Sequence, residues 1–353
     1  MQPKAQPYDA FLLLSFGGPE GTADVIPFLE NVTRGRNIPR ERLAEVGEHY
    51  FMFDGISPIN QQCRDLVAAV ETDFAAHGVE LPVYWGNRNW DPFVEDILAR
   101  MAEQGVRRVV ALATSAHSSY SSHRQYREDI TRAQAALGPR APEVDLIRPY
   151  YDQPGFITAL AEHTRDALHR IPVELRGQTP LLYSAHSIPT VMAAASGDPR
   201  HEYGPGGAYV AQLAEAARLI TEHVETELGM SFNYELVYQS RSGSPSQPWL
   251  EPDVNDRLEE LARQGLRCAV IVPHGFVSDH MEVLYDLDVE ATETAGKLGI
   301  RLERALSPGT HPAFVSMIRE LVVERGDPTA EQRSLSRLGP CPDVCPTDCC
   351  ART

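Results

Sequence analysis

Short runs of apolar residues alternate along this 353-residue chain with longer segments in which apolar residues recur at helical spacing. The short runs predict β-strands, and the longer segments predict amphipathic helices. The expected strands are residues 11–14, 83–85, 109–113, 181–183, 236–238 and 270–272. The expected helices are residues 92–104, 155–169, 210–228, 254–264 and 281–298. Helices between single apolar strands predict right-handed βαβ crossovers, and therefore parallel sheets covered on both faces.

The two halves of the chain repeat one pattern weakly, although chance similarity between two βα units is the alternative. The first half reads FLLLSFGGP, VYWGNRNW and RRVVALATSAHSSYSSHRQY, and the second reads PLLYSAHSIP, VYQSRSGSPSQPW and RCAVIVPHGFVSDHMEVLYD. Each half places a polar loop directly after an apolar strand, at the carboxyl edge where open α/β proteins bind ligands. The repeat predicts an α/β protein with two similar Rossmann-like domains, each a parallel sheet flanked by helices, facing one cleft.

The pattern also predicts a domain organisation. We expect a first domain of residues 1–116 together with 305–325, and a second domain of residues 117–304. Residues 31–60 are mostly helical in pattern but rich in arginine and aromatic residues, which is typical of an inserted helical flap. Residues 326–353 are rich in proline and polar residues until the cysteines, so we expect a C-terminal extension outside the core.

The composition is that of a globular protein, with 42% hydrophobic and 23% charged residues. The formal net charge is −17, so phosphate-rich partners are repelled and no nucleic-acid binding is expected. No stretch reaches the roughly 18 to 20 apolar residues that span a bilayer. The apolar run near the start is too short for the core of a signal peptide. We expect a cytoplasmic monomer without a transmembrane segment.

Three carboxylates recur at a spacing of four in the predicted helix 281–298. Glu282, Asp286 and Glu290 therefore lie on one helical face, one turn apart. Like charges in a row repel each other, so this ridge lowers stability unless a cation visits it. Carboxylate oxygens are hard ligands that suit a divalent cation. The alternative is a solvated acidic face on an acidic protein.

His186 follows an apolar strand directly, within the sequence SAHSIP. A histidine at this sheet edge can act as a base near neutral pH or as a metal ligand, and a structural role is the alternative. If His186 and Glu282 lie at equivalent ends of one sheet, they face each other across the cleft. The chain lacks G-x-G-x-x-G, G-x-x-x-x-G-K-[ST] and G-x-S-x-G, so neither a nucleotide cofactor nor a catalytic triad is expected.

Four of the six cysteines lie close together near the C-terminus. They are Cys341, Cys345, Cys349 and Cys350, whereas Cys63 and Cys268 stand alone. Four thiolates suit zinc or an iron–sulfur cluster. The spacing C-x3-C-x3-C-C lacks the longer loop of typical structural zinc sites. A disordered tail of reactive thiols is the alternative.

The chain resembles the ferrochelatase family, and most of all its actinobacterial coproporphyrin branch, over nearly its whole length. The segments that carry the resemblance are LLLSFGGPE, PFLENVTRGR, GISPIN, YWGNRNW, SAHSIP, YQSRSG, PWLEPD and GFVSDHMEVLYDLD. The resemblance implies two chelatase-type domains around a porphyrin cleft. It also implies insertion of Fe2+ into coproporphyrin III, giving coproheme for haem biosynthesis, without a nucleotide or redox cofactor. The alternatives are a protoporphyrin IX ferrochelatase, a cobalt chelatase acting on a corrin precursor, and a non-catalytic haem or iron–sulfur sensor.

The resemblance assigns roles to particular residues. His186 and Glu282 match the family residues that bind iron. The sequence does not fix how they divide the work, and we hypothesise His186 as proton acceptor and Glu282 as the last metal-bound carboxylate. Asp286 and Glu290 match the ridge that conducts the metal inward. The residues expected to line the porphyrin site are Phe16, Arg34, Arg36, His49, Tyr50, Ser57 and Tyr126. Phe16 stands where many relatives carry an iron-ligating tyrosine, so it cannot supply an axial oxygen ligand.

The resemblance also bears on the cysteines and on partners. Some relatives hold a [2Fe–2S] cluster with three tail cysteines and one cysteine from the body of the protein. Here the tail supplies four, so Cys341 is the simplest fourth ligand, with Cys63 and Cys268 as alternatives. The expected partners are the porphyrin, Fe2+ and, transiently, neighbouring enzymes of the haem pathway.

Overall fold

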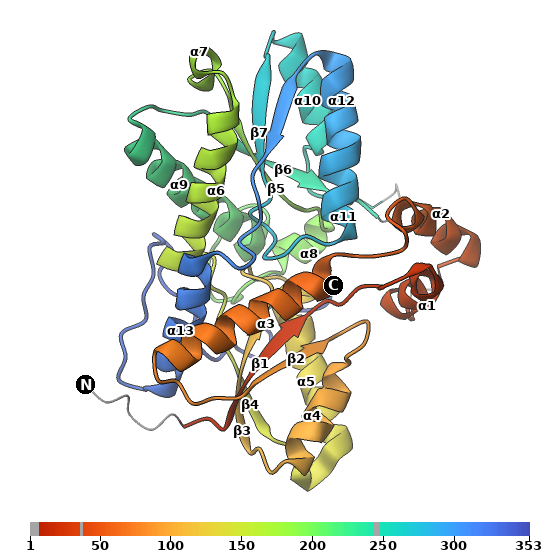
Figure 1. Ribbon diagram of the computed structural model, residues 1–353, viewed down its shortest axis with the longest axis vertical. Helices are drawn as coiled ribbons and strands as arrows, with labels where there is room; N and C mark the ends of the chain where they lie inside the picture. Colours follow the sequence, from red (N-terminus) through yellow and green to blue (C-terminus); the bar gives the residue numbers. More distant parts are fainter. Residues whose placement is uncertain (1–6, 36–37, 243–246) are drawn as a thin grey trace.

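The computed structural model describes residues 7–35, 38–242 and 247–353. Its strands form two parallel sheets that lie one above the other along the long axis of the molecule (Figure 1). The first sheet has the order β2-β1-β3-β4 and the second has the order β6-β5-β7-β8. The strands are β1 (Ala10–Ser15), β2 (Val83–Asn87), β3 (Arg108–Ala113), β4 (Glu143–Leu146), β5 (Leu181–His186), β6 (Tyr234–Gln239), β7 (Cys268–Val272) and β8 (Arg301–Arg304). The equivalent orders confirm the predicted pair of similar parallel α/β domains.

Helices cover both faces of each sheet, and every expected strand and helix is present. The α-helices are α1 (Thr22–Val32), α2 (Arg40–Phe51), α3 (Ile59–Ala76), α4 (Val94–Glu103), α5 (Gln125–Leu137), α6 (Pro154–Arg170), α7 (Val173–Arg176), α8 (Thr190–Ala194), α9 (Gly207–Leu228), α10 (Val254–Arg263), α11 (Met281–Val283), α12 (Thr292–Leu298) and α13 (Pro312–Gly326). The remaining helical segments are the π-helices η1 (Tyr120–Arg124) and η3 (Leu284–Ala291) and the 3₁₀ turn η2 (Gly138–Arg140). Among the described residues, no helix is long and apolar enough to cross a bilayer.

The edge strands β4 and β8 were not expected from the sequence. Each has four residues, EVDL and RLER, in which charged side chains interrupt the apolar pattern. The structure also differs from the expected division between residues 116 and 117. That division assigns β4 to the second domain, whereas β4 is hydrogen-bonded to β3 of the first sheet. An edge strand needs only one apolar face, so its sequence signal is weak. The other domain boundaries stay predictions.

The two sheets share a central core. Successive side chains of β1 point to opposite faces, as a pleated strand requires. Phe11 and Leu13 enter a buried cluster that also contains Tyr183 of β5 and Val270 of β7, whereas Leu12 packs with the residues of α4 and α5. Helices α6, α9 and α13 contribute to this shared cluster, and α13 packs against both α3 and α6. The domains are therefore joined by apolar packing and not only by the chain.

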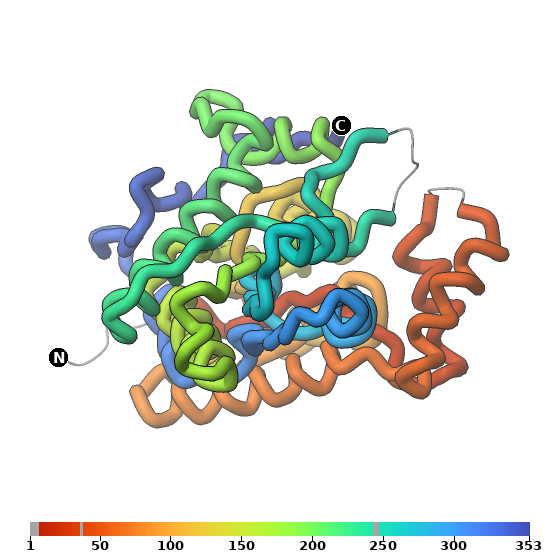
Figure 2. The backbone as a smooth tube through the Cα atoms, turned by 90° about the horizontal axis from the view of Figure 1, so that it is seen from above, coloured from red at the N-terminus to blue at the C-terminus, as the bar shows by residue number. Residues whose placement is uncertain are grey.

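The predicted flap is a pair of helices, α1 and α2, that projects beside α11 (Figures 1 and 2). Its helical part begins at Thr22, nine residues before the expected start at residue 31. Phe28, Leu43 and Tyr50 form a small buried cluster with Met281 at the start of α11. This packing attaches the flap to the second domain although its chain belongs to the first. Arg36 lies outside the described residues.

The C-terminal extension contains no helix or strand after α13, and it is packed against the protein. The buried Arg148 binds Glu324 and donates to the Arg333 carbonyl. Leu335 donates its backbone N–H to the Asp152 carbonyl at 3.1 Å. These contacts bring the cysteines back onto the body of the molecule, which is not the behaviour of a disordered tail.

Candidate active site

A histidine and a glutamate meet at the carboxyl edge of the second sheet. His186 is the last residue of β5, and Glu282 lies in α11, which follows the adjacent strand β7. Nε2 of His186 lies 3.3 Å from Oε2 of Glu282, and the side chains are 33% and 44% exposed. The sequence predicted that the two residues would face each other if they lay at equivalent ends of one sheet. They do lie at one sheet edge, because β5 and β7 are neighbours.

The ring orientation of His186 is held by its second nitrogen. Nδ1 donates to the Ser187 carbonyl oxygen at 2.5 Å, which leaves Nε2 toward Glu282. Burial lowers the pKa of His186, but the hydrogen bond and negative charge of Glu282 outweigh burial, and the net shift is upward. Burial raises the pKa of Glu282, but the hydrogen bond from His186 and the charges of nearby histidines together outweigh burial and lower the pKa to about 2. The charged forms of the two residues therefore stabilise each other, and the pair offers one nitrogen and one carboxylate to a cation that replaces the shared proton.

The carboxylate ridge continues from Glu282 along a π-helix. Asp286 and Glu290 both lie in η3, and π-helical turns are frequent at functional sites. Burial and the charge of Glu282 raise the pKa of Asp286 to about 7. Burial is also the main cause that raises the pKa of Glu290. The ridge therefore retains protons near neutral pH, and a divalent cation relieves the same repulsion. Its role as a metal path stays a prediction.

Asp286 accepts hydrogen bonds from two residues for which the sequence predicted no role. The Ser240 hydroxyl donates to its carboxylate, and Gln239 donates its side-chain N–H to the same oxygen at 3.3 Å. Gln239 ends β6, so both residues lie at the carboxyl edge next to His186. Ser240 has a φ of 62°, a strained value for a residue other than glycine. The sequence signal was the polar YQS that follows an apolar strand.

Two predicted flap residues lie beside this ridge. The His49 ring stacks on Tyr285 of η3, with centroids 3.8 Å apart and planes 9° from parallel. Tyr50 is 8% exposed and packs with Met281 and Phe28. Burial raises the pKa of Tyr50, and the charges of Glu282 and Asp286 add to the shift, so its hydroxyl stays neutral. The structure thus brings His49 and Tyr50 close to the His186–Glu282 pair.

The other predicted porphyrin-site residues are dispersed. Phe16 follows β1, is 37% exposed and meets Phe28 edge-on. Arg34 is exposed at the end of the first flap helix. Ser57 and Tyr126 are each only 4% exposed, and Tyr126 belongs to the core cluster of the first domain. Neither buried hydroxyl is presented at the surface in this structure, and all four roles stay predictions.

The tail cysteines gather at the end of the chain as unpaired thiols. The sulfur atoms of Cys349 and Cys350 lie 3.5 Å apart. Burial raises the pKa of Cys341 to about 12, and a hydrogen bond with Cys349 is the main cause that raises the pKa of Cys345 to about 12. Within the described ranges, no three His, Cys, Asp or Glu side chains are arranged to hold a metal ion. Cys63 and Cys268 lie in the central core.

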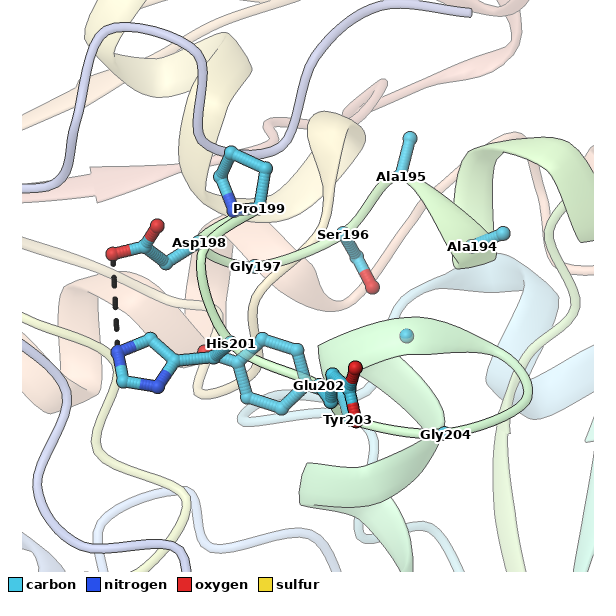
Figure 3. A pocket seen from close by; sticks show the side chains of 11 residues that line it. Ala194, Ala195, Ser196, Gly197, Asp198, Pro199, His201, Glu202, Tyr203 and Gly204 are labelled. Atoms are coloured by element: carbon cyan, nitrogen blue, oxygen red, sulfur yellow. Dashed lines mark ion pairs between the residues drawn. The ribbon is translucent and has the colours of Figure 1, made fainter.

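A cavity of about 480 Å³ lies in the loop between α8 and α9 (Figure 3). Its walls include Ser196, Gly197 and Tyr203, and Asp198 lies 4.0 Å from Nε2 of His201. Neither His186 nor Glu282 lines this cavity, so it is separate from the candidate active site.

Two parallel sheets of equivalent order, each flanked by helices, define a two-domain Rossmann-like α/β protein. SirB from Bacillus subtilis with Fe3+ has a similar structure, with a TM-score of 0.52 and 12% sequence identity over 90% of this chain and 96% of that chain. At this identity the similarity shows the fold alone.

The sequence comparisons identify the family. The ferrochelatase family model matches residues 8–326, so the chain belongs to the ferrochelatase family. A coproporphyrin III ferrochelatase of Streptomyces griseus is 51% identical over 98% of this chain and 93% of its own. One of Streptomyces coelicolor is 52% identical, with 98% and 94% covered. A ferrochelatase of Rhodopirellula baltica is 49% identical, also with 98% and 94% covered. These findings confirm the resemblance seen in the sequence.

Proposed function

We propose that the protein inserts Fe2+ into coproporphyrin III, with His186 and Glu282 at the reacting centre. The observation that carries the proposal is the 3.3 Å contact between the two side chains at a ligand-accessible sheet edge. The coproporphyrin III ferrochelatases that are about half identical to the chain over nearly its full length support the choice of substrate.

Insertion requires that Fe2+ lose its bound water in stages. Glu290, Asp286 and Glu282 form a series of carboxylates that leads to His186 along η3 and α11. Each carboxylate replaces water with a fixed oxygen ligand, so no single step carries the whole cost of dehydration. The metal arrives at Nε2 of His186 and the carboxylate of Glu282, which share a proton in the resting protein, and the displaced proton passes to solvent.

The reaction releases two protons, because Fe2+ replaces the two pyrrole N–H hydrogens and no electrons move. His186, once deprotonated, accepts one through Nε2, while Nδ1 remains bonded to Ser187. The second proton passes to the ridge, where the pKa of Asp286, raised to about 7 mainly by burial, suits proton exchange at neutral pH. Glu282, whose pKa stays low because of the hydrogen bond from His186, remains charged and holds the metal.

The porphyrin must also be gripped and bent so that its nitrogen lone pairs face the metal. Binding at the rim of the ring offsets this strain. We assign the grip to Phe16, Arg34, His49 and Tyr50. Ser57 and Tyr126, which are both buried in this structure, are assigned as further contacts to the propionates. Arg36 belongs to the same proposal but lies outside the described residues.

The direct test is anaerobic insertion of Fe2+ into coproporphyrin III and protoporphyrin IX, measured side by side. We expect turnover with coproporphyrin III to be at least about ten-fold higher, because its four propionates offer more charged contacts to the rim. His186→Ala should bind the porphyrin but lose nearly all insertion. Preference for protoporphyrin IX would overturn the substrate, and wild-type turnover by His186→Ala would remove this residue from the reaction.

A separate experiment tests the metal path. Glu290→Ala should raise the Fe2+ concentration needed for half-maximal rate, while turnover at saturating Fe2+ changes little. Glu293→Ala, at an exposed carboxylate one helix segment further on, is the control. If Glu290→Ala has the same Fe2+ dependence as the wild-type protein, the ridge is a solvated acidic face and not a metal path.

We further propose that Cys341, Cys345, Cys349 and Cys350 hold a [2Fe–2S] cluster. The donor type fits, since all four residues are unpaired thiols, and the sulfurs of Cys350 and Cys341 accept N–H hydrogen bonds from Gly197 and Gln212. Within the described residues the thiols are not arranged to hold a metal ion, so a cluster requires the tail to rearrange around it. Arg127, which donates to the Cys345 carbonyl, also has a buried guanidinium nitrogen without a partner in the described part of the chain. A bound cluster supplies a one-electron centre, and insertion requires no electron. Anaerobically purified protein should contain iron and labile sulfide, whereas zinc without sulfide would reverse the assignment.

We also propose that the protein acts as a cytoplasmic monomer with transient contacts to neighbouring haem-pathway enzymes. All six cysteines are unpaired, which fits a reducing compartment. Light scattering on the purified chain should give a mass near 39.1 kDa, and a stable value of twice that mass would contradict the monomer.

A further inference from the structure

The hydroxyl of Tyr209 is bonded to the backbone of the proposed catalytic histidine. Tyr209 lies in the first turn of α9, is 6% exposed, and donates to the His186 carbonyl oxygen at 2.9 Å. The next carbonyl along the chain, that of Ser187, accepts the hydrogen bond from Nδ1 of the His186 ring. Tyr209 therefore holds the peptide group between His186 and Ser187. The Ser187 carbonyl that orients the imidazole ring follows directly after this peptide group.

A first series of hydrogen bonds connects the cysteine tail to Tyr209 through the loop before α9. The Cys350 N–H donates to the Gly197 carbonyl, and the Gly197 N–H donates to the Cys350 sulfur, both at 3.2 Å. The adjacent Ser196 accepts the backbone N–H of Tyr209 on its hydroxyl oxygen at 2.8 Å. Ser196 and Gly197 are consecutive in the wall of the cavity in Figure 3.

A second route runs through Gln212, three residues after Tyr209 on the same side of α9. Gln212 is 2% exposed, and its side-chain N–H group donates to the Cys341 sulfur at 3.4 Å and to the Ser118 hydroxyl at 3.0 Å. Its carbonyl oxygen accepts the Ser118 N–H at 2.7 Å. Cys341 therefore contacts α9 directly through Gln212, and Cys350 contacts the loop whose Ser196 is bonded to Tyr209 of α9.

We propose that Tyr209 is a positioning residue for His186, and that the cysteine tail acts on metal insertion by holding the first turn of α9. The inference rests on the proposed role of His186. In this proposal the tail acts by keeping the His186 ring in one orientation, because a preorganised base lowers the barrier to proton transfer. Electron transfer is not part of this proposal.

Tyr209→Phe tests the positioning role, because it keeps the ring and removes only the hydroxyl. Tyr183→Phe is the matched control, since its buried hydroxyl also links β5 to α9, through Thr221 at 2.8 Å, but does not contact His186. We expect Tyr209→Phe to lower kcat about five-fold, the effect of one lost hydrogen bond, with the KM for coproporphyrin III unchanged. Tyr183→Phe should retain the wild-type kcat. Equal kcat values for the two variants would overturn the proposal.

Hydrogen exchange supplies a readout that is independent of activity. In Tyr209→Phe, backbone amides of the loop after His186 should exchange faster than in the wild-type protein. In Tyr183→Phe, the loop should exchange at the wild-type rate. Unchanged exchange of the loop in Tyr209→Phe would contradict the proposed anchoring.

A double-mutant cycle tests the link to the tail. Gln212→Leu should lower kcat in the wild-type and Tyr183→Phe backgrounds, but should have little further effect in Tyr209→Phe. Ser196→Ala provides the same cycle along the other route if Gln212→Leu does not fold. Additive effects with Tyr209→Phe would overturn the link.

His186→Ala separates this inference from the function on which it rests. Wild-type turnover by His186→Ala would overturn both. An inactive His186→Ala together with a fully active Tyr209→Phe would overturn the positioning role alone.

Discussion

Each nitrogen of the His186 ring has its own partner, Nδ1 the Ser187 carbonyl and Nε2 the Glu282 carboxylate. This division lets one residue keep its orientation while the atom that faces the metal gains or loses a proton. The residue types and their places after strands were readable from the sequence. The sequence did not reveal Ser240 as the partner of Asp286, because that contact joins residues 46 positions apart.

At the residue scale, the raised pKa of Asp286 makes the stability of the protein depend on pH. Burial and Glu282 raise its pKa from 3.8 to about 7, so between these values the folded protein holds a proton that the unfolded chain releases. The free energy of unfolding therefore falls as the pH rises through this window. Asp286→Asn removes the penalty, and it should be about 2 kcal/mol more stable than the wild-type protein at pH 8.

Urea denaturation at pH 8 and pH 4 measures this effect, and the gain should disappear at the lower pH. Asp288→Asn is the control, because Asp288 is exposed on the same helix and is paired with Arg304. A gain of equal size at both pH values would show that repulsion and burial at Asp286 are not its cause.

At the scale of single elements, the structure departs from regular patterns where the site is formed. The predicted helix 281–298 is interrupted by the π-helix η3, which carries two of the three ridge carboxylates. The flap helices begin earlier than their pattern indicated and pack on α11. Helical periodicity reports which residues share a face. It does not distinguish an α-turn from a π-turn, because both keep residues at a spacing of four on nearly the same side.

Gly55 lies in the turn that follows the second flap helix, against the start of the first flap helix. Gly55 has a φ of 73°, and an added Cβ would lie 2.5 Å from the backbone of Thr22 at the start of α1. Gly55→Ala should therefore displace the flap and raise the KM for coproporphyrin III several-fold. The control is Gly78→Ala, since Gly78 has a φ of 70° but no atom within 4 Å of the added Cβ.

Steady-state kinetics and thermal unfolding distinguish displacement of the flap from backbone strain alone. Gly78→Ala should lower stability by about 1 kcal/mol through backbone strain alone and leave the KM unchanged. If both variants raise the KM equally, the flap is not a part of the porphyrin site.

At the scale of the whole molecule, the shared core between the sheets predicts that the two domains unfold together. Helices α6 and α13 pack closely where they cross in this core, since an added Cβ at Gly155 would lie 2.3 Å from the Ala313 carbonyl oxygen. Gly155→Ala should lower the free energy of unfolding by about 3 kcal/mol, in one cooperative transition. Gly296→Ala, in a helix with open space around the new methyl group, should instead add about 0.5 to 1 kcal/mol.

Calorimetry and denaturant titration monitored with two probes check this prediction. Two separate transitions in the wild-type protein, or a neutral Gly155→Ala variant, would contradict a single shared core.

The sequence by itself determined every strand except β4 and β8, the parallel α/β class, the spacing of the ridge carboxylates, the position of His186 at a strand end and the family. These follow from local spacing, because hydrophobic period and motif order are properties of neighbouring residues. Tertiary structure decided which strand ends meet, so that His186 and Glu282 share one sheet edge. It also decided that β4 joins the first sheet, that Ser57 and Tyr126 are buried, and that the cysteine tail contacts α9. Contacts between distant residues depend on the packing of the whole chain, and no local pattern encodes them.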